Sequence, residues 1–548
     1  MTLSEIKRRF DSLVSDRTSI ENTWDIIEKF IMPYRGDFFQ KNPTENSVEW
    51  GNRDVYDCTA IMAAQNLASA LQGSITPSSI KWFELSFEDS KLNLDLEVMR
   101  WLEQSGKACF QALQDSNFNR EANETYLDIV GFGSSVIVEE AENEVDWDGL
   151  NFQSVPIREC YFEEDSKGGV YNFYRNLKYT PVQLLDKFGK EGIPKNILEM
   201  AADSGQVNTK LDIIFCIFRR KGVKNDKFPA TIEQREFGSK YILVKESVQL
   251  GKEGGYYEMP AFVPRWRRTN NSKWGHSPSM FALGDVLTLN ELVQLILKSL
   301  EKVVNPTTLT TERGLLSDLD LASGGVSVVR NIDDVKAYES KARFDVAELN
   351  REKLQDQINR AFYVDQFSLK QTPAMTAAEV HARMELMNRL IGPTLSRLQN
   401  DFLDPLIQRT FNILLRANQL PPIPEKLQKE VKERGIKISY VSPLYRAQLS
   451  DHIGAVQQWL TILGAMSEVP GFQDILDIPN ADEIARGTGQ MLGVPLVMVN
   501  SIDETKRART QRKQAEQRQQ TLQAIETLGS ASKDIATAQS LAPGGIPQ

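Results

Sequence analysis

The segment of residues 277–304 is the feature that most restricts how this chain can fold. Ser277 and Pro278 supply a helix cap and a proline suited to the first helical position, so the segment predicts a long helix. Its apolar residues cover much more than one stripe of that helix: Met280, Phe281, Leu283, Val286, Leu287, Leu289, Leu292, Val293, Leu295, Ile296, Leu297 and Leu300. Such a helix must be covered on several sides, either by its own domain or by copies of itself in neighbouring subunits.

Length and composition indicate a globular protein. The chain has 548 residues, of which 41% are hydrophobic and 25% charged, and it is long enough for several domains. No run approaches the roughly 18 uncharged apolar residues of a membrane-spanning helix. The first ten residues, MTLSEIKRRF, lack the apolar core of a signal peptide. We therefore expect no membrane partner and a protein that works in the cytoplasm or in a particle assembled there.

The charge and the scarce reactive residues argue against most chemistry. A net charge of −10 is unsuited to coating DNA, which requires Lys and Arg to displace counterions. The cysteines stand far apart without a CxxC pair and are expected to be buried small apolar residues: Cys58, Cys109, Cys160 and Cys216. The histidines are equally scattered. The sequence predicts no metal, no cofactor and no enzyme.

One glycine-rich motif and one basic segment each have two interpretations. GFGSS, residues 131–135, lacks the GKS ending of a phosphate loop and precedes a strand, so we interpret it as a tight turn. Residues 506–518 hold six basic residues and one acidic residue. A solvated helix face is favoured there over a polyanion-binding patch.

The periodicity predicts an α+β fold that is mainly α. Apolar spacing indicates helices over about 3–32, 54–73, 94–116 and 121–129. Between residues 131 and 268 the period shifts towards two, which predicts an antiparallel sheet that includes SSVIVEEA, GGVYNFYRNLKY, LDIIFCIFRR and SKYILVKESVQL. A strand is expected in 436–444, and two or three helices in 447–499.

A long helix is interrupted between residues 362 and 376. Leu349, Leu354, Ile358 and Phe362 have helical spacing, so a helix is expected over 346–362. A capping box at Thr376 opens a second helix, which runs to about residue 417. Two prolines in it, 393 and 405, predict kinks. The polar interval between the two helices is longer than a hinge needs.

Four blocks of the sequence, in this order, resemble the head-to-tail connecting (portal) proteins of short-tailed, podovirus-type bacteriophages. They are VYDCTAIMAAQNLASALQGSITPSSIKWFEL, DIVGFGSSVIVEE, WGHSPSMFALGDVLTLNELVQ and TAAEVHARMELMNRLIGPTLSRLQNDFLDPLIQRTFNIL. The resemblance runs from about residue 3 to residue 498. It implies a dodecameric ring at one capsid vertex, the channel for genome packaging and ejection, without enzymatic activity.

The resemblance also implies partners and a domain order. Double-stranded DNA would pass through the channel. Terminase, a tail adaptor, capsid protein and scaffolding protein would bind the ring. The ring would be part of the virion and would be assembled in the host cytoplasm. The implied domains are a wing (1–274 and 376–444), stem helices (275–304 and 345–362), a small α/β clip (305–344), a tunnel loop (363–375) and a helical crown (445–500). Residues 501–548 are expected to form a basic helix and a disordered tail.

The candidate site residues form three groups. The tunnel loop supplies weak contacts to passing DNA: Gln366, Ser368, Lys370, Gln371 and Thr372. The stem supplies Lys353 and Arg360, seven apart on one helix face; the equally weighted alternative pairs them with Glu348, Glu352 and Asp356. The subunit interface is predicted at Leu292, Ile296 and Leu300.

Three rival interpretations stay open. The interval 363–375 can be a simple surface connector between helices. The protein can be a structural adaptor or scaffold of the virion that has no channel. A packaging ATPase or nuclease is disfavoured, because it needs a GxxxxGK[ST] loop or clustered carboxylates beside a histidine, and neither occurs in the sequence.

Overall fold

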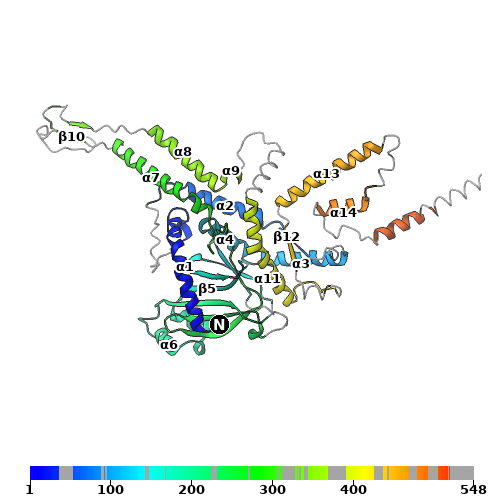
Figure 1. Cartoon of the computed structure of the whole chain (residues 1–548), viewed down its shortest axis with the longest axis horizontal. Helices are drawn as coiled ribbons and strands as arrows, with labels where there is room; N and C mark the ends of the chain where they lie inside the picture. Colours follow the sequence, from blue (N-terminus) through cyan, green and yellow to red (C-terminus); the bar gives the residue numbers. More distant parts are fainter. Residues whose placement is uncertain are drawn as a thin grey trace, which may run out of the picture. The chain divides into compact units, whose positions relative to one another are not determined.

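The computed structural model forms two compact units (Figure 1). It describes residues 1–35, 54–87, 92, 95–141, 147–166, 168–223, 231–269, 272–304, 308–310, 328–329, 331, 335–337, 344–367, 391–424, 427, 436–440, 443–467, 478–491, 504–515 and 517–518. Unit 1 comprises Met1–Glu88, Leu102–Ile423 and Gln428–Ser442; unit 2 comprises Asp89–Trp101, Pro424–Leu427 and Pro443–Gln548.

The predicted helices of the N-terminal region are confirmed. They are α1 (Leu3–Phe30), α2 (Thr59–Ile75), α3 (Leu96–Asp115) and α4 (Phe118–Phe132), with a short 3₁₀ turn, η1 (Pro33–Arg35), after α1. The Thr2 side chain caps α1 by accepting a hydrogen bond from the Glu5 amide. Trp24 is fully buried and donates its indole N–H to the Phe132 carbonyl at 3.0 Å, which joins α1 to the end of α4.

The strands form two antiparallel sheets in this region, so the prediction of a single sheet is wrong. The first has the order β3–β2–β9, from Asn151–Val155, Val136–Glu140 and Ala261–Phe262. The second has the order β4–β5–β6–β7–β8, from Cys160–Glu164, Val170–Tyr179, Leu211–Arg219, Phe237–Leu243 and Val248–Tyr256. Local periodicity reveals strands, but the pairing of β2 with β9 depends on residues far along the chain.

Helix α1 packs on the five-stranded sheet. Its N-terminal half and the sheet share one buried cluster: Ile6, Phe10, Leu13, Tyr161, Tyr174, Ile214, Cys216, Phe218 and Ile242. The connections between the strands carry α5 (Pro181–Phe188), α6 (Lys195–Ala202) and the 3₁₀ turns η4 (Ile157–Glu159), η5 (Lys190–Gly192) and η6 (Ile232–Gln234).

The GFGSS motif forms the left-handed end of helix α4 and leads into β2. Gly133 is the C-cap with φ +79°, a conformation that glycine adopts without steric cost. A Cβ atom added at Gly133 would lie 2.3 Å from the Gly275 carbonyl oxygen. The motif is therefore a structural turn that lets the connector before α7 approach closely.

The two helices on either side of the predicted clip are confirmed as α7 (Pro278–Val304) and α8 (Phe344–Ala361). Between them, β10 (Thr308–Thr310) pairs antiparallel with β11 (Val335–Ala337). A short helix, α9 (Val364–Phe367), follows α8.

The predicted kinked helix is described from residue 391 onward, so its start at Thr376 lies outside the described residues. Residues 391–398 are helical through Pro393. A π-helical segment, η8 (Gln399–Leu403), then precedes α11 (Asp404–Arg416), which has Pro405 in its first turn. Proline has no amide hydrogen and clashes with the carbonyl of the preceding turn, and the wider π turn accommodates both effects.

A buried ionic network fixes α11 to the sheets of unit 1. The Arg409 side chain is 1% exposed, and it faces the fully buried Glu139 of β2 at 3.8 Å and Glu258 at 3.3 Å. Glu258 also binds Arg416 at 2.6 Å, and the Thr410 hydroxyl donates to Glu139 at 2.7 Å. Buried charges are tolerated only when they are paired in this way.

The strand expected in 436–444 is confirmed as β12 (Lys437–Tyr440), which pairs antiparallel with β1 (Phe83–Ser86) in unit 1. Unit 2 contains α13 (Pro443–Ser467) and α14 (Ala481–Met491). Residues 504–515 of the basic segment are helical, and Arg509 forms an ion pair with Asp482 at 2.5 Å. Part of the basic segment therefore serves an ion pair within its own unit.

The cysteine prediction is wrong for one residue of the four. Cys109, Cys160 and Cys216 are buried as expected, whereas Cys58 is exposed at the N-cap of α2. Cys58 lies just before the first residue of α2. The apolar periodicity that directs side chains of the helix towards the core therefore does not apply to it. Burial raises the pKa of the three buried thiols, which leaves almost no reactive thiolate at neutral pH.

We expect a maleimide to label one thiol in each native, dissociated subunit and all four in denaturant. The native reaction should disappear in Cys58→Ser, because the remaining thiols are buried and protonated. Mass spectrometry of the labelled chain gives the stoichiometry directly. A second thiol that labels at the Cys58 rate in the native chain would contradict the burial described here.

Candidate functional site: the α7–α8 hairpin

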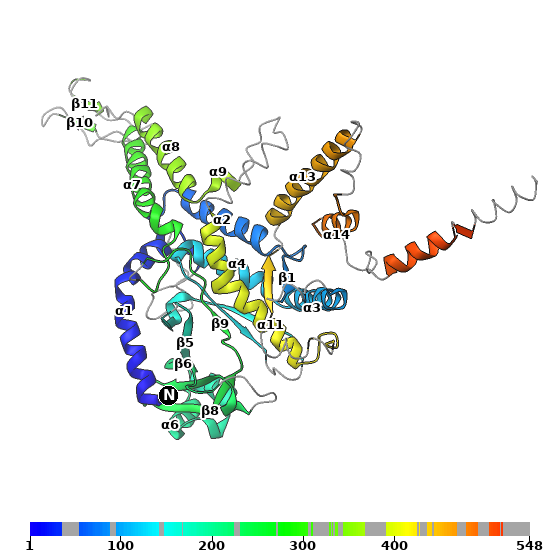
Figure 2. The same ribbon diagram turned by 45° about the vertical axis from the view of Figure 1, so that its right-hand side comes forward.

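Helices α7 and α8 pack side by side and project from the rest of unit 1 (Figure 2). Two serine hydroxyls at the start of α7 anchor the pair to α4. Ser277 donates to the Gly131 carbonyl and Ser279 to the Val130 carbonyl, each at 2.8 Å. The Ser277 oxygen also accepts the Met280 amide at 3.0 Å, so the predicted helix cap is confirmed.

The segment before α2 ties both helices of the hairpin together. Asn290 accepts the Tyr56 amide and donates to the Asp54 carbonyl, each at 2.7 Å. Gln294 donates to the Tyr56 hydroxyl at 2.9 Å, and Gln355 of α8 donates to Asp57 at 2.8 Å. Sequence reasoning missed these contacts. The available signal was the pair of amides, Asn290 and Gln294, one turn apart in a largely apolar helix.

The two ends of the hairpin differ in burial. Near the body, α7 buries Pro278, Ser279, Ala282, Val286 and Leu289. Towards the tip, the hairpin exposes large apolar side chains: Leu295 (53%), Leu297 (48%), Leu300 (42%), Val303 (47%), Val304 (83%), Val346 (44%) and Leu349 (51%). Of the predicted interface residues, Leu292 and Ile296 are partly buried and Leu300 is exposed. Several exposed large apolar side chains at one end of a hairpin indicate a binding surface.

Helix α7 is also, among the described helices, the one long and apolar enough by length and composition to cross a membrane. From the sequence alone no membrane-spanning helix is expected. The N-terminal part of α7 is nevertheless held in unit 1 by the hydrogen bonds of Ser277 and Ser279. The helix also carries two acidic residues, Asp285 and Glu291. We therefore interpret its exposed apolar residues as a protein-binding surface.

The predicted stem cations lie on the exposed surface of α8. Neither Lys353 nor Arg360 forms an ion pair within the described part of the chain; the ion pair on α8 joins Arg351 to Glu348 at 3.2 Å. Arg360 lines a hollow of about 350 Å³ at the foot of the hairpin. The other lining residues are Trp266, Arg267, His276, Ser277, Pro278, Met280, Phe281, Ala361 and Tyr363.

The end of α8 is firmly held, and the chain then turns sharply. Ile358 and Phe362 are fully buried. Tyr363 adopts φ +57°, in the left-handed region, which costs a non-glycine residue about 1 kcal/mol or more. Of the predicted tunnel-loop residues, Gln366 lies in α9, and Ser368, Lys370, Gln371 and Thr372 lie outside the described residues.

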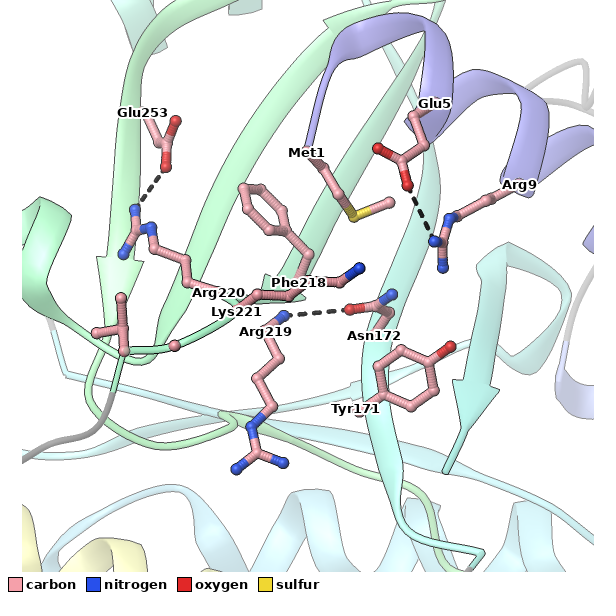
Figure 3. A pocket seen from close by; sticks show the side chains of 12 residues that line it. Met1, Glu5, Arg9, Tyr171, Asn172, Phe218, Arg219, Arg220, Lys221 and Glu253 are labelled. Atoms are coloured by element: carbon pink, nitrogen blue, oxygen red, sulfur yellow. Dashed lines mark hydrogen bonds and ion pairs between the residues drawn. The ribbon is translucent and has the colours of Figure 1, made fainter. Parts of the chain in front are cut away.

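A larger hollow, of about 810 Å³, lies between the start of α1 and the five-stranded sheet (Figure 3). Its three guanidinium groups are paired: Arg9 with Glu5 at 2.9 Å, Arg219 with Glu236 at 2.8 Å and Arg220 with Glu253 at 2.5 Å. Burial opposes ionisation of Glu253, but hydrogen bonds from Arg220 and Lys240 hold its pKa below the ordinary value. These charges are balanced within the subunit.

The described part of the chain is thus an α+β subunit with a projecting hairpin whose apolar side chains are partly uncovered towards the tip. The chain belongs to the family of bacteriophage head-to-tail connecting proteins, whose model matches residues 3–499. It is therefore a structural connector of the phage particle and not an enzyme. The resemblance in the four sequence blocks is confirmed.

The curated relatives are portal proteins. The probable portal protein of Bordetella phage BPP-1 is 26% identical over 530 residues, covering 93% of this chain and 91% of the relative. The portal protein of Salmonella phage epsilon15 is 26% identical over 551 residues, covering 98% and 96%. A solved structure, the neck of an empty GTA particle computed with C6 symmetry, matches with a TM-score of 0.38 at 11% identity, covering 83% of this chain and 95% of that chain.

Proposed function

We propose that copies of this chain form a dodecameric ring at one capsid vertex, and that its bore is the channel for genome packaging and ejection. The observation that carries the proposal is the exposed apolar surface towards the tip of the α7–α8 hairpin. In water that surface is unfavourable by about 25 cal/mol for each Å² of apolar area. Covering it with neighbouring hairpins removes this cost for every copy.

The hairpin has the two different faces that a ring requires. In a cyclic assembly each subunit uses one face towards one neighbour and another face towards the next. At the tip, α7 exposes Leu297 and Leu300 on one side of the helix, and α8 exposes Val346 and Leu349. The α7 face of one copy would therefore meet the α8 face of the next.

The remaining domain assignments are those that the family resemblance implies. The clip, at the tip of the hairpin with the β10–β11 pair, would bind terminase and later the tail adaptor. The wing would contact capsid and scaffolding proteins, and residues 445–500 would form the crown. The ring would assemble in the host cytoplasm.

DNA would pass the channel by weak contacts. A net charge of −10 for each chain keeps the duplex mobile by repulsion. Lys353 and the tunnel-loop residues Gln366, Ser368, Lys370, Gln371 and Thr372 would reduce that barrier locally, because isolated phosphate contacts position a strand without holding it tightly.

The direct test is negative-stain microscopy and native mass measurement of the purified protein. We expect closed rings with an axial hole and no substantial population of the 62.0 kDa monomer at micromolar concentration. An assembly without a hole would favour the structural adaptor instead. A monomer at these concentrations would refute the ring.

Shortening the tunnel loop by deleting residues 368–372 should impair DNA handling and spare assembly. Helix α8 is fixed before the deletion by Ile358 and Phe362, which are fully buried. Rings should therefore form, while heads built with the deletion should retain shorter genomes. The measurement is genome length in purified heads, with Lys370→Ala as a mild companion variant. Full-length, stably retained genomes would show that the segment is only a connector.

A further inference from the structure

The hollow at the foot of the α7–α8 hairpin, here called the foot pocket, is basic. Among its ten lining residues are Arg267, His276 and Arg360, and none of the ten is Asp or Glu. Arg267 and His276 belong to the connector before α7, where the His276 amide donates to the Arg267 carbonyl at 2.7 Å. Arg360 comes from the last turn of α8. The connector and α8 thus bring cations together in an acidic chain.

These cations differ from those of the hollow beside α1. There, Arg9 and Arg220 are neutralised by carboxylates of the same subunit. In the foot pocket, Arg267 and Arg360 are exposed, and neither forms an ion pair with a carboxylate of the described ranges. The foot pocket therefore offers two guanidinium groups that can bind a carboxylate with paired, charge-assisted hydrogen bonds.

An exposed apolar side chain, Phe281, is among the residues that line the foot pocket. Phe281 is 84% exposed, the most exposed large apolar side chain of the described residues. Phe281, Thr288 and Leu295 follow one another at intervals of seven and lie near one stripe of α7. A partner that lies along this stripe of α7 and covers Leu295 would also reach Phe281, about 21 Å away at a rise of 1.5 Å per residue.

We propose that the foot pocket receives an acidic side chain of the adjacent copy of this chain, with Phe281 packed against the same neighbour. The inference rests on the proposed ring. It adds a charged contact at the foot of the α7–α8 hairpin to the apolar contact near the tip of the same hairpin. Acidic residues outnumber basic ones, 74 to 64, so a neighbouring copy supplies the complementary charge. Duplex DNA fits less well, because its phosphate backbone offers no apolar surface for Phe281, and a paired guanidinium site would hold a strand that must slide.

The test uses the full chain with Arg360→Glu and Arg267→Glu. The matched control is Arg8→Glu, an equal charge reversal at an exposed residue near the N-terminal end of α1. Sedimentation at a series of protein concentrations gives the concentration of half assembly, which is the protein concentration at which half of the subunits are in rings. We expect the two foot-pocket variants to raise it about tenfold or more, as for charge reversal at a desolvated interfacial pair. Arg8→Glu should match the wild type, and Arg360→Lys should lie between them.

Each other outcome overturns the proposal in a distinguishable way. Equal assembly of Arg360→Glu, Arg8→Glu and wild type would refute the foot-pocket contact and leave the ring standing. Normal rings with shortened packaged genomes would assign the foot pocket to DNA. A lowered unfolding midpoint in dissociated subunits would assign it to another segment of the same chain. A wild-type chain that stays monomeric would refute the ring and this contact together.

Discussion

Leu300→Asp should convert rings into dispersed subunits that remain folded. Leu300 is 42% exposed in the subunit, so an aspartate there meets water and leaves the fold intact. In the ring the same position would be covered by a neighbouring hairpin, and an unpaired carboxylate would be desolvated at every interface. We expect the concentration of half assembly to rise about 100-fold, equivalent to about 2.7 kcal/mol for each contact.

Val182→Asp is the matched control for this experiment. Val182 lies on helix α5 and is 38% exposed, close to the value for Leu300, but it is not part of the hairpin. Circular dichroism should be the same for both variants and the wild type, whereas only Leu300→Asp should lose rings in native mass measurement. Rings of normal stability in Leu300→Asp would show that the tip surface is covered by a different protein.

Helices could be predicted from the sequence because their ends depend on neighbouring residues. The helix expected over 277–304 is observed as Pro278–Val304, since Ser277 caps it through the Met280 amide. The helix expected over 346–362 is observed as Phe344–Ala361. In both cases caps and apolar spacing act within a few residues, so a single sequence carries the information.

Strand partners could not be predicted, because pairing joins residues far apart. Phe83 of β1 lies opposite Tyr440 of β12, and Ile137 of β2 lies opposite Phe262 of β9. Alternation of apolar and polar residues marks each strand but does not select its neighbour. For this reason one expected sheet became two.

The candidate site was only partly visible in the sequence. Arg360 was selected for its position on one face of α8, but the foot pocket also needs Arg267 and His276 from a connector far away in the sequence. Phe281 was counted as one of many apolar residues of α7, and nothing local marks it as 84% exposed. Exposure depends on which neighbours the fold supplies, and periodicity does not contain that information.

Arg409→Met should destabilise the isolated subunit strongly without altering the hairpin. It removes the cation that faces Glu139 at 3.8 Å, and the side chain of Glu139 is fully buried. Breaking a buried ion pair from one side typically costs about 3–5 kcal/mol. Thr410 would still donate to Glu139, but a hydroxyl does not neutralise the charge.

The double variant Arg409→Met with Glu139→Gln separates the lost charge from the lost packing. Removing both charges should recover much of the stability, since the desolvation penalty of the carboxylate disappears. The measurement is the urea midpoint of dissociated subunits followed by tryptophan fluorescence, with the exposed Arg8→Met as control. If Arg409→Met matched Arg8→Met, or if the double variant were less stable than the single, the buried pair would not hold α11 against β2 as described.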